Sequence, residues 1–240
     1  MKKSLLIATS LLFTSSAYAV PVTFFDTIVG GQTSFTNTVT GTGATVITDT
    51  LSGLSSGTSW DMGDYTISTT DGSSASVYSA STNTSTGQMI GISPASPAPD
   101  SGITFTFDTA INALGFEVGD WATCCLPSAL YIGFDGGATQ LVGSASSYTD
   151  NPTVAAGGSY TNDTIFVGAI DDTSTFLSVI FYGDGFGEFL TAGGTIYYST
   201  VDEGSVPPPN AVPLPAAAFM FAPALLGFMG LRRKAKNSVA

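Results

Sequence analysis

Residues 103–107 read Ile-Thr-Phe-Thr-Phe, with an apolar side chain at every second position. Successive side chains of a β-strand point to opposite faces, so this alternation predicts a strand with one buried face. The same half-buried pattern returns at residues 114–118 and at residues 130–134, where the turn sequence Asp-Gly-Gly follows. These three segments predict that the second half of the chain is built from β-sheet.

Other segments carry strand signals of varying strength, and the region 51–101 is rich in Ser, Thr and Gly with only short apolar islands. The segment 94–100 contains three prolines and is predicted to be a loop. No helical periodicity of convincing length occurs between Val20 and Gly204. Many short strands with Gly and Asp turns predict an all-β fold, a β-sandwich or jelly-roll-like domain. The further predicted strands are 22–29, 34–40, 44–50, 65–67, 76–78, 88–90, 165–170, 177–182 and 195–201.

The charges divide the chain into three parts. All six basic residues lie at the two ends, all 18 carboxylates lie between them, and there is no histidine. Between residues 4 and 231 the chain therefore has no side-chain cation. Such a domain repels nucleic acid and anionic lipid, which excludes both as partners.

The N-terminal segment has the three parts of a secretory signal in order. Lys2 and Lys3 are followed by an apolar run at residues 5–13, and Ala17 and Ala19 form a small-x-small cleavage site. We expect export by Sec-type machinery and cleavage by signal peptidase after Ala19. An N-terminal membrane anchor is the alternative, but the apolar run is too short to span a bilayer.

The C-terminal segment 212–231 carries no charge, and as a helix its 20 residues would cover about 30 Å, the thickness of a hydrocarbon core. This predicts a single transmembrane helix. Pro213 and Pro215 favour a start near Ala216, and Pro223 removes one backbone donor inside the span. A buried core helix is the alternative, which the basic residues that follow disfavour. The residues predicted to stop transfer across the membrane are Arg232, Arg233, Lys234 and Lys236.

The sequence Val212-Pro213-Leu214-Pro215-Ala216, followed by the apolar span and the basic end, resembles the VPLPA variant of the PEP-CTERM sorting tail. The resemblance implies an exported bacterial protein whose tail is processed near the proline motif by an exosortase-type membrane protease. The five motif residues would then be the recognition site of that other enzyme. A second resemblance, carried by residues 105–107, 113–121 and 166–168, is to the β-rich ectodomains that precede such tails, and it implies no catalytic residues.

The predicted organisation has four parts. A signal peptide occupies residues 1–19, and an acidic β-rich extracytoplasmic domain occupies residues 20–203. A proline-rich linker at 204–211 is expected to be stiff and extended. The sorting tail with its transmembrane helix and basic end occupies residues 212–240.

Catalytic chemistry is restricted by what the domain lacks. Without His, Lys or Arg there is no Ser-His-Asp or Cys-His system and no phosphate clamp. A pair of carboxylates acting as a glycosidase remains a third hypothesis. Its candidate acids are Glu117, Asp120, Asp171, Asp172, Asp184 and Glu188.

Uncompensated carboxylates also suit a structural calcium ion, because Ca²⁺ takes oxygen ligands. Five aspartates lie at predicted strand ends, although no Asp-x-Asp-x-Asp-Gly loop occurs. The alternative is that these are solvated turn residues whose charge keeps an exported protein soluble. The metal candidates are Asp120, Asp135, Asp171, Asp172 and Asp184.

Cys124 and Cys125 are adjacent. A bond between neighbours is strained, because their Cα atoms lie about 3.8 Å apart, below the usual disulfide window of about 4.4–6.8 Å. Inter-chain pairing and two thiols are the other options, and the three stay open. No other Cys and no His is available to complete a metal site with them.

Aromatic residues could stack on sugar rings, but aromatic residues in strands more often belong to the core. The aromatic candidates are Trp60, Trp121, Tyr131, Tyr182, Tyr197 and Tyr198.

The first functional hypothesis is a non-enzymatic protein, membrane-anchored as a precursor and then held at the cell surface or in the extracellular matrix of a Gram-negative bacterium. The alternative is a carbohydrate-binding module that takes a polysaccharide, with or without calcium.

Overall fold

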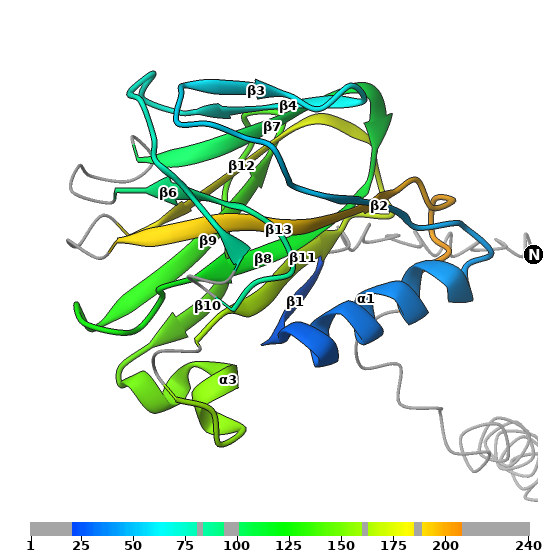
Figure 1. The fold of residues 1–240 in the computed structure, drawn as a ribbon. Coiled ribbons are helices and arrows are strands. Elements are labelled where there is room, and N and C mark those ends of the chain that lie inside the picture. Colours follow the sequence, from blue (N-terminus) through cyan, green and yellow to red (C-terminus); the bar gives the residue numbers. More distant parts are fainter. Residues whose placement is uncertain (1–20, 81–83, 94–100, 160–162, 185–188, 208–240) are drawn as a thin grey trace, which may run out of the picture. The chain divides into compact units, whose positions relative to one another are not determined.

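The structure is a computed structural model in which two antiparallel β-sheets pack face to face (Figure 1). The predicted β-sandwich is therefore confirmed. The signal peptide, the linker beyond Pro207 and the sorting tail lie outside the part of the chain that is described. The described residues are 21–80, 84–93, 101–159, 163–184 and 189–207.

No helix within these ranges is long and apolar enough to cross a lipid bilayer. The apolar segment 212–231 lies outside them, as do the sorting motif, the basic end and the cleavage site at Ala17 and Ala19. The transmembrane helix therefore stays a prediction.

The first sheet has seven strands within the described residues. β13 lies near its centre and pairs with β8, β6 and β2. β1 pairs with β11, far along the chain, so the edge of the sheet is formed by segments that are distant in sequence. In spatial order the strands are β1 (Val22–Thr27), β11 (Ile165–Ile170), β8 (Ala113–Gly119), β13 (Leu190–Ser199), β6 (Met89–Ile92) and β5 (Val77–Tyr78), with β2 (Ile47–Thr50) also on β13.

The second sheet has six strands in the described part of the chain. The decisive segment 103–107 lies in β7, and 130–134 lies in β9, so both predictions are confirmed. Neither β3 nor β10 was predicted. In spatial order the strands are β10 (Gln140–Ala145), β9 (Ser128–Phe134), β12 (Phe176–Gly183), β7 (Gly102–Ile111), β4 (Tyr65–Thr69) and β3 (Ser59–Asp61).

The main core lies between the two sheets. Phe116 of the first sheet sits between Phe105 and Phe181 of the second, with ring centroids 5.1 Å and 4.9 Å away. All three side chains are fully buried. Alternate apolar positions of the strands therefore supply the contacts between the sheets.

The segment after β1 is a helix, α1 (Ile28–Gly41), and the strand predicted at 34–40 and the absence of helices were both wrong. The buried residues Gly31, Phe35 and Val39 recur at four-residue spacing on one face of the helix. Thr27 Oγ1 accepts a hydrogen bond from Gly30 N at 3.2 Å and caps the helix. Tertiary packing thus overrides the low helix propensity of a Thr- and Gly-rich segment.

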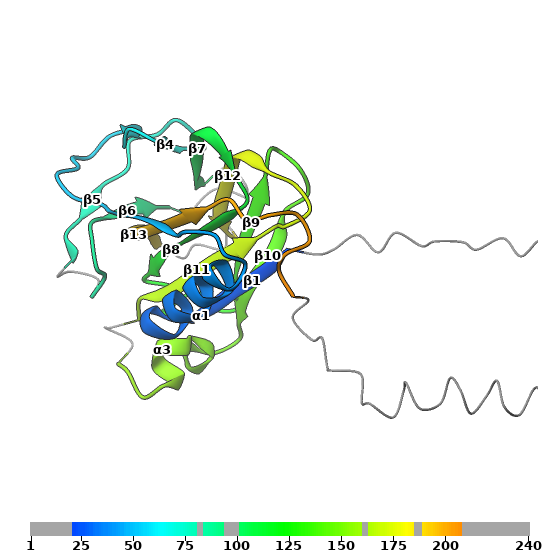
Figure 2. The same ribbon diagram turned by 90° about the vertical axis from the view of Figure 1, so that its right-hand side faces the viewer.

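Helix α1 covers the outer face of the first sheet, over β1, β11 and β8 (Figure 2). The Phe35 ring lies 5.3 Å from Phe24 and 5.8 Å from Phe166, between helix and sheet. The half-buried pattern predicted for β8 is therefore corrected, because every residue of β8 is buried. Glu117, which was expected to face solvent, lies under this third layer.

The short helices η1 (Tyr148–Asp150) and α3 (Pro152–Ala155) follow β10 and were not predicted.

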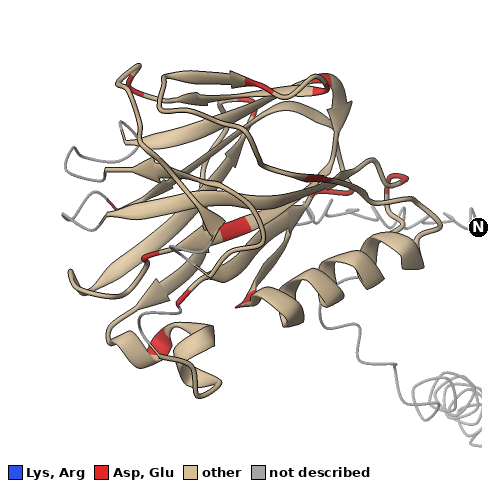
Figure 3. Ribbon diagram, in the orientation of Figure 1, with Lys and Arg blue, Asp and Glu red and all other residues tan. Residues whose placement is uncertain are grey.

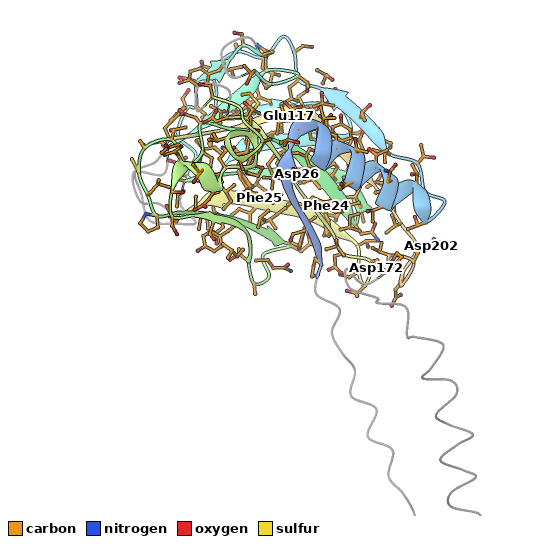
Figure 4. All side chains as sticks on the ribbon, turned by 90° about the horizontal axis from the view of Figure 1, so that it is seen from below. Phe24, Phe25, Asp26, Glu117, Asp172 and Asp202 are labelled. Atoms are coloured by element: carbon orange, nitrogen blue, oxygen red, sulfur yellow. The ribbon has the colours of Figure 1, made fainter. Side chains whose placement is uncertain are left out.

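The two ends of the described domain lie at the same end of the sandwich. Val22 pairs with Ile170 at the start of β1. Asp172, two residues after Ile170, accepts a hydrogen bond from Val206 N at 2.8 Å. The labelled Asp172 and Asp202 are seen on this side in Figure 4. We refer to this as the terminal end of the sandwich.

Candidate functional site

Glu117 is the most unusual titratable residue of the described domain. Its side chain is 0% exposed, although it lies in the middle of a sheet in a domain without a side-chain cation. It belongs to β8, where it pairs with Phe166 of β11 and with Gly193 of β13. Figure 4 shows it beside the first turns of α1. A buried carboxyl group needs hydrogen-bond partners to offset its lost hydration.

Those partners come from three separate segments of the chain. From α1, Gln32 Nε2 donates to Glu117 Oε1 at 3.2 Å. From the segment before β6, Thr86 N donates to Oε2 at 2.8 Å, and Thr86 Oγ1 donates to Oε1. From β13, Thr195 N donates to Oε1 at 3.5 Å. One carboxylate oxygen therefore receives a carboxamide, a hydroxyl and a backbone N–H.

A chain of hydroxyl groups continues from this carboxylate. Thr86 Oγ1 lies 2.6 Å from Thr195 Oγ1, which lies 2.8 Å from Thr50 Oγ1 on β2. Thr50 is exposed at the surface. Each hydroxyl can donate one hydrogen bond and accept others. The hydroxyls can therefore rotate to donate to Glu117 when it is ionised and to accept from it when it is protonated. We call Gln32, Thr86, Glu117, Thr195 and Thr50 the Glu117 network.

The backbone of β13 is shaped to admit the carboxylate. The pairing of β13 with β8 shifts register between Gly193 and Tyr197, which marks a β-bulge. Gly194 in this bulge has φ of +68°, and a Cβ added to it would collide with Glu117 Oε2. Glycine is required there both for the backbone angle and for the space.

Burial raises the pKa of Glu117 above that of a solvated glutamate, while the hydrogen bonds from Thr86 and Thr195 partly lower it. No cation opposes the shift. Burial and the negative charge of Glu117 also raise the pKa of the neighbouring Tyr197. Glu117 is thus a carboxyl group that holds a proton more readily than a solvated glutamate does.

A second buried acid lies at the opposite end of the sandwich from the terminal end. Asp163, which is 6% exposed, accepts from Asp120 N through Oδ1 at 3.3 Å. Its other oxygen, Oδ2, has no hydrogen-bond partner among the described residues, and neither has Trp121 Nε1. Burial, and then the charge of Asp120, raise the pKa of Asp163 to about 6. No pattern in the sequence marked Asp163 as a site residue.

Two tyrosine–aspartate pairs flank the core near the terminal end. Tyr65 Oη donates to Asp49 Oδ2 and Tyr198 Oη donates to Asp64 Oδ2, both at 2.8 Å. Burial and these aspartates raise the pKa of Tyr65 and raise that of Tyr198 to about 12. Tyrosine hydroxyls therefore donate hydrogen bonds to these carboxylates, a contact that Lys or Arg side chains make in many other domains.

The predicted calcium ligands are not brought together. Asp120 and Asp184 follow β8 and β12 at one end, and Asp135, Asp171 and Asp172 follow β9 and β11 at the other. Asp135 Oδ1 instead accepts from Ser178 N at 2.8 Å, and Asp171 Oδ1 from Thr173 N at 3.0 Å. Among the described residues no three carboxylate or thiol side chains are grouped to hold a metal ion.

Most of the aromatic candidates for sugar stacking belong to the core. Trp60, Trp121, Tyr182 and Tyr198 are at most 7% exposed. Tyr131 is half-buried, and its ring stacks on Tyr182 at 5.4 Å. Tyr197 is half-buried under α1, its ring 6.4 Å from Phe35.

Cys124 is exposed and Cys125 half-buried, in the loop between β8 and β9. Glu188 lies outside the described residues.

An open groove of about 200 Å³ lies at the end of the sandwich remote from the terminal end, where β7 begins and β6 ends. One aromatic ring, Phe189, faces it and packs against Tyr78 with ring centroids 5.7 Å apart. Among the described lining residues the one carboxylate is Asp71, which accepts from Ser73 N at 2.9 Å. The hydroxyl residues of the lining are Thr69, Ser73, Ser74, Ser76, Ser93 and Ser101.

Comparison with known proteins adds little to this picture. No model of a protein family matches the chain, and no curated protein matches it. A family 29 carbohydrate-binding module with a tyrosine-to-alanine substitution is 13% identical, with a TM-score of 0.33 over 69% of this chain and 99% of the module. An aspartate-to-alanine variant is 14% identical, with a TM-score of 0.31 over 70% of this chain and 97% of the variant. A third family 29 module is 14% identical, with a TM-score of 0.31 over 71% of this chain and 97% of the module. At TM-scores this low, the likeness carries no argument about ligand.

Replacing Gly194 by alanine is expected to destabilise the domain more than replacing Gly53. Both glycines have positive φ, +68° and +71°, but a Cβ at Gly53 meets no atom within 4 Å. Gly53→Ala should cost about 1 kcal/mol from backbone strain, and Gly194→Ala about 1–3 kcal/mol more, because Glu117 must move. Urea unfolding measures both variants, and equal losses would contradict the packing argument.

The pKa of Asp163 predicts a specific pH dependence. The folded chain holds the Asp163 proton up to about pH 6, whereas the unfolded chain releases it near pH 4, so stability from this group falls as pH rises through that interval and is constant above it. In Asp163→Asn this fall should vanish. The difference in unfolding free energy between wild type and variant should change by about 1–3 kcal/mol between pH 4 and pH 7. Parallel curves would show that Asp163 titrates normally.

Proposed function

We propose that this chain is an exported bacterial protein, displayed at the cell surface or in the extracellular matrix, whose acidic β-sandwich binds rather than catalyses. The observation that carries the proposal is the charge map. All six cations lie in the two predicted targeting segments, and all 18 carboxylates lie between them. Signals that are read by export machinery need those cations, and the domain itself uses none.

The distribution of charge on the folded domain supports this proposal. Figure 3 shows carboxylates spread over both sheets and the loops, with no basic residue on the described ribbon. A threonine hydroxyl donates to the buried Glu117, and tyrosine hydroxyls donate to the half-buried Asp49 and the exposed Asp64. The acidic surface keeps the domain soluble and repels anionic polymers.

The geometry of the terminal end also fits display. Val22 and Val206 both lie there, and Asn112, 2% exposed, holds the last described segment through Val201, accepting from its N at 2.7 Å and donating to its O at 2.8 Å. An attachment that follows Pro207 would therefore start from one end of the sandwich.

In this proposal signal peptidase removes residues 1–19, and an exosortase-type protease recognises residues 212–216. Arg232, Arg233, Lys234 and Lys236 would hold the precursor in the membrane, because positive charge resists translocation. The aspartates predicted as calcium ligands would be ordinary turn residues.

Replacing these four basic residues by serine is expected to weaken membrane retention of the precursor. The matched control is Arg232→Lys with Arg233→Lys, which keeps the charge and should keep retention. Fractionation of cells that make the full chain measures both. Unchanged retention of the serine variant would remove the support for a stop-transfer function.

A second candidate function is the binding of a neutral polysaccharide in the hydroxyl-lined groove. The observation that favours it is the lining itself, in which six hydroxyl residues surround one aromatic ring. Sugar hydroxyls exchange hydrogen bonds with such side chains, and an aromatic face packs against a pyranose ring. The negative domain would repel an acidic polymer, so the polymer should be neutral.

Filling the groove should abolish such binding. In Ser74→Trp the indole would occupy the groove, and affinity for a neutral glycan bound by the wild type should fall at least about tenfold. Ser34→Trp, at an exposed position on α1, is the control and should bind like the wild type. A glycan array followed by calorimetry makes the measurement. Equal affinities in the two variants would place any binding elsewhere.

A further inference from the structure

The Glu117 network contains the three groups that an acyl transfer requires. Thr86 supplies a hydroxyl nucleophile, Gln32 supplies a carboxamide as acyl donor, and Glu117 supplies a buried carboxyl group between them. They come from α1, from β8 and from the segment before β6, so the fold alone brings them together. No part of the proposed function uses this arrangement.

From this juxtaposition we propose that Thr86 and Gln32 react to form an intramolecular ester cross-link. Thr86 Oγ1 attacks Gln32 Cδ, the Cδ–Nε2 bond breaks, and ammonia leaves. The products are an ester between the two side chains and one molecule of ammonia, so all atoms are accounted for. The reaction needs no oxidant, cofactor or metal.

The position of one oxygen atom supports the proposal most directly. Glu117 Oε1 accepts from Thr86 Oγ1, whose proton must be removed, and from Gln32 Nε2, which must gain a proton to leave as ammonia. A proton taken from the hydroxyl can therefore be passed to the leaving nitrogen without movement of the carboxylate. Glu117 ends in the state in which it began, as a general base that becomes a general acid.

The distances are compatible with a pre-reaction arrangement. Two groups hydrogen-bonded to the same oxygen lie within about 6 Å of each other, and the bond requires an approach to about 3–3.5 Å. Gln32 has three rotatable side-chain bonds that can close this gap. Thr86 is fixed in place by its own N–H, which donates to Glu117 Oε2 at 2.8 Å.

The surroundings favour the reaction and its persistence. Burial raises the pKa of Glu117, which makes its carboxylate a stronger base. Ammonia that escapes is protonated in water and does not return. Thr86 is exposed and Gln32 half-buried, but Glu117 is fully buried, so a hydrolytic water has poor access to the carboxylate oxygen that would activate it. The cross-link would join α1 to the segment before β6 in an exported domain that has no ion pairs between side chains.

Mass spectrometry of the full-length chain tests the proposal. The chain is recovered under denaturing conditions and digested with a protease that cuts before aspartate, since trypsin has no site between residues 4 and 231. Gln32 then lies in peptide 26–48 and Thr86 in peptide 71–99. We expect these two peptides to be joined, with a mass about 17 Da below their sum, the mass of one ammonia. Hydroxylamine, which cleaves esters, should separate them.

Five variants make the result specific. Thr86→Val and Gln32→Glu should lose the joined peptide, because one lacks the nucleophile and the other lacks the leaving ammonia. Thr86→Ser keeps a hydroxyl and should retain it. Thr191→Val removes a buried β13 hydroxyl that has no hydrogen-bond partner among the described residues and lies outside the network, and should also retain it. Glu117→Gln should slow joining by about 100-fold or more.

Several outcomes would overturn the proposal. Separate wild-type peptides of unchanged mass would show that the contacts are only hydrogen bonds. A gain of about 1 Da on peptide 26–48 would show hydrolysis of Gln32 in place of linkage. Joining that survives in Thr86→Val would assign the nucleophile to another residue. None of these results bears on export and display, which are tested separately by fractionation.

Discussion

A carboxyl group buried in a domain that has no cation is the constraint around which this fold is arranged. Glu117 cannot be neutralised by an ion pair, so every stabilising contact must be a hydrogen bond from a neutral donor. Oε1 accepts from side chains of α1 and of the segment before β6 and from the backbone of β13, and Oε2 accepts from the backbone of the segment before β6. If any of these segments were displaced, Glu117 would remain buried without one of its hydrogen-bond partners, which would lower the stability of the fold. The position of the outer layer on the first sheet is therefore tied to one side chain.

The same solution recurs elsewhere in the domain. Asp49 and Asp64 are each paired with a tyrosine hydroxyl, Asp172 with a backbone N–H, and Asn112 bridges both polar groups of Val201. Neutral donors hold acids without creating the salt-dependent attractions that ion pairs give. Such a domain can be strongly acidic and still compact, which suits a protein proposed to work outside the cell. Asp163 is the exception, since one of its oxygens has no partner among the described residues.

Sequence patterns predicted the strands well where both sheets pack on the main core. Segment 165–170 matches β11, and 103–107, 130–134 and 177–182 all lie within observed strands. Period-two alternation works for 103–107 and 130–134 because those strands present one face to the core shared by the two sheets. Segment 165–170 was predicted from a near-continuous apolar run instead, and every residue of β11 is buried. The helix α1 was missed because its buried residues include a glycine, and its remaining positions are Thr, Ser and Asn, which are weak helix formers. Its stability comes from Phe35 packing between Phe24 and Phe166, a contact that no local pattern reports.

The candidate site shows the same division. In the sequence Glu117 stands as one of several strand acids, Thr86 as one of many threonines, and Gln32 was not considered at all. What the sequence determined by itself was the charge map and the alternation of the strands, because charge is a property of composition and alternation is local to a strand. Only the tertiary structure decided that a third layer covers β8 and that two side chains and a backbone N–H, far apart in the chain, converge on one oxygen atom. The physical reason is that burial and convergence depend on long-range packing, which the order of residues along a single strand or helix does not contain.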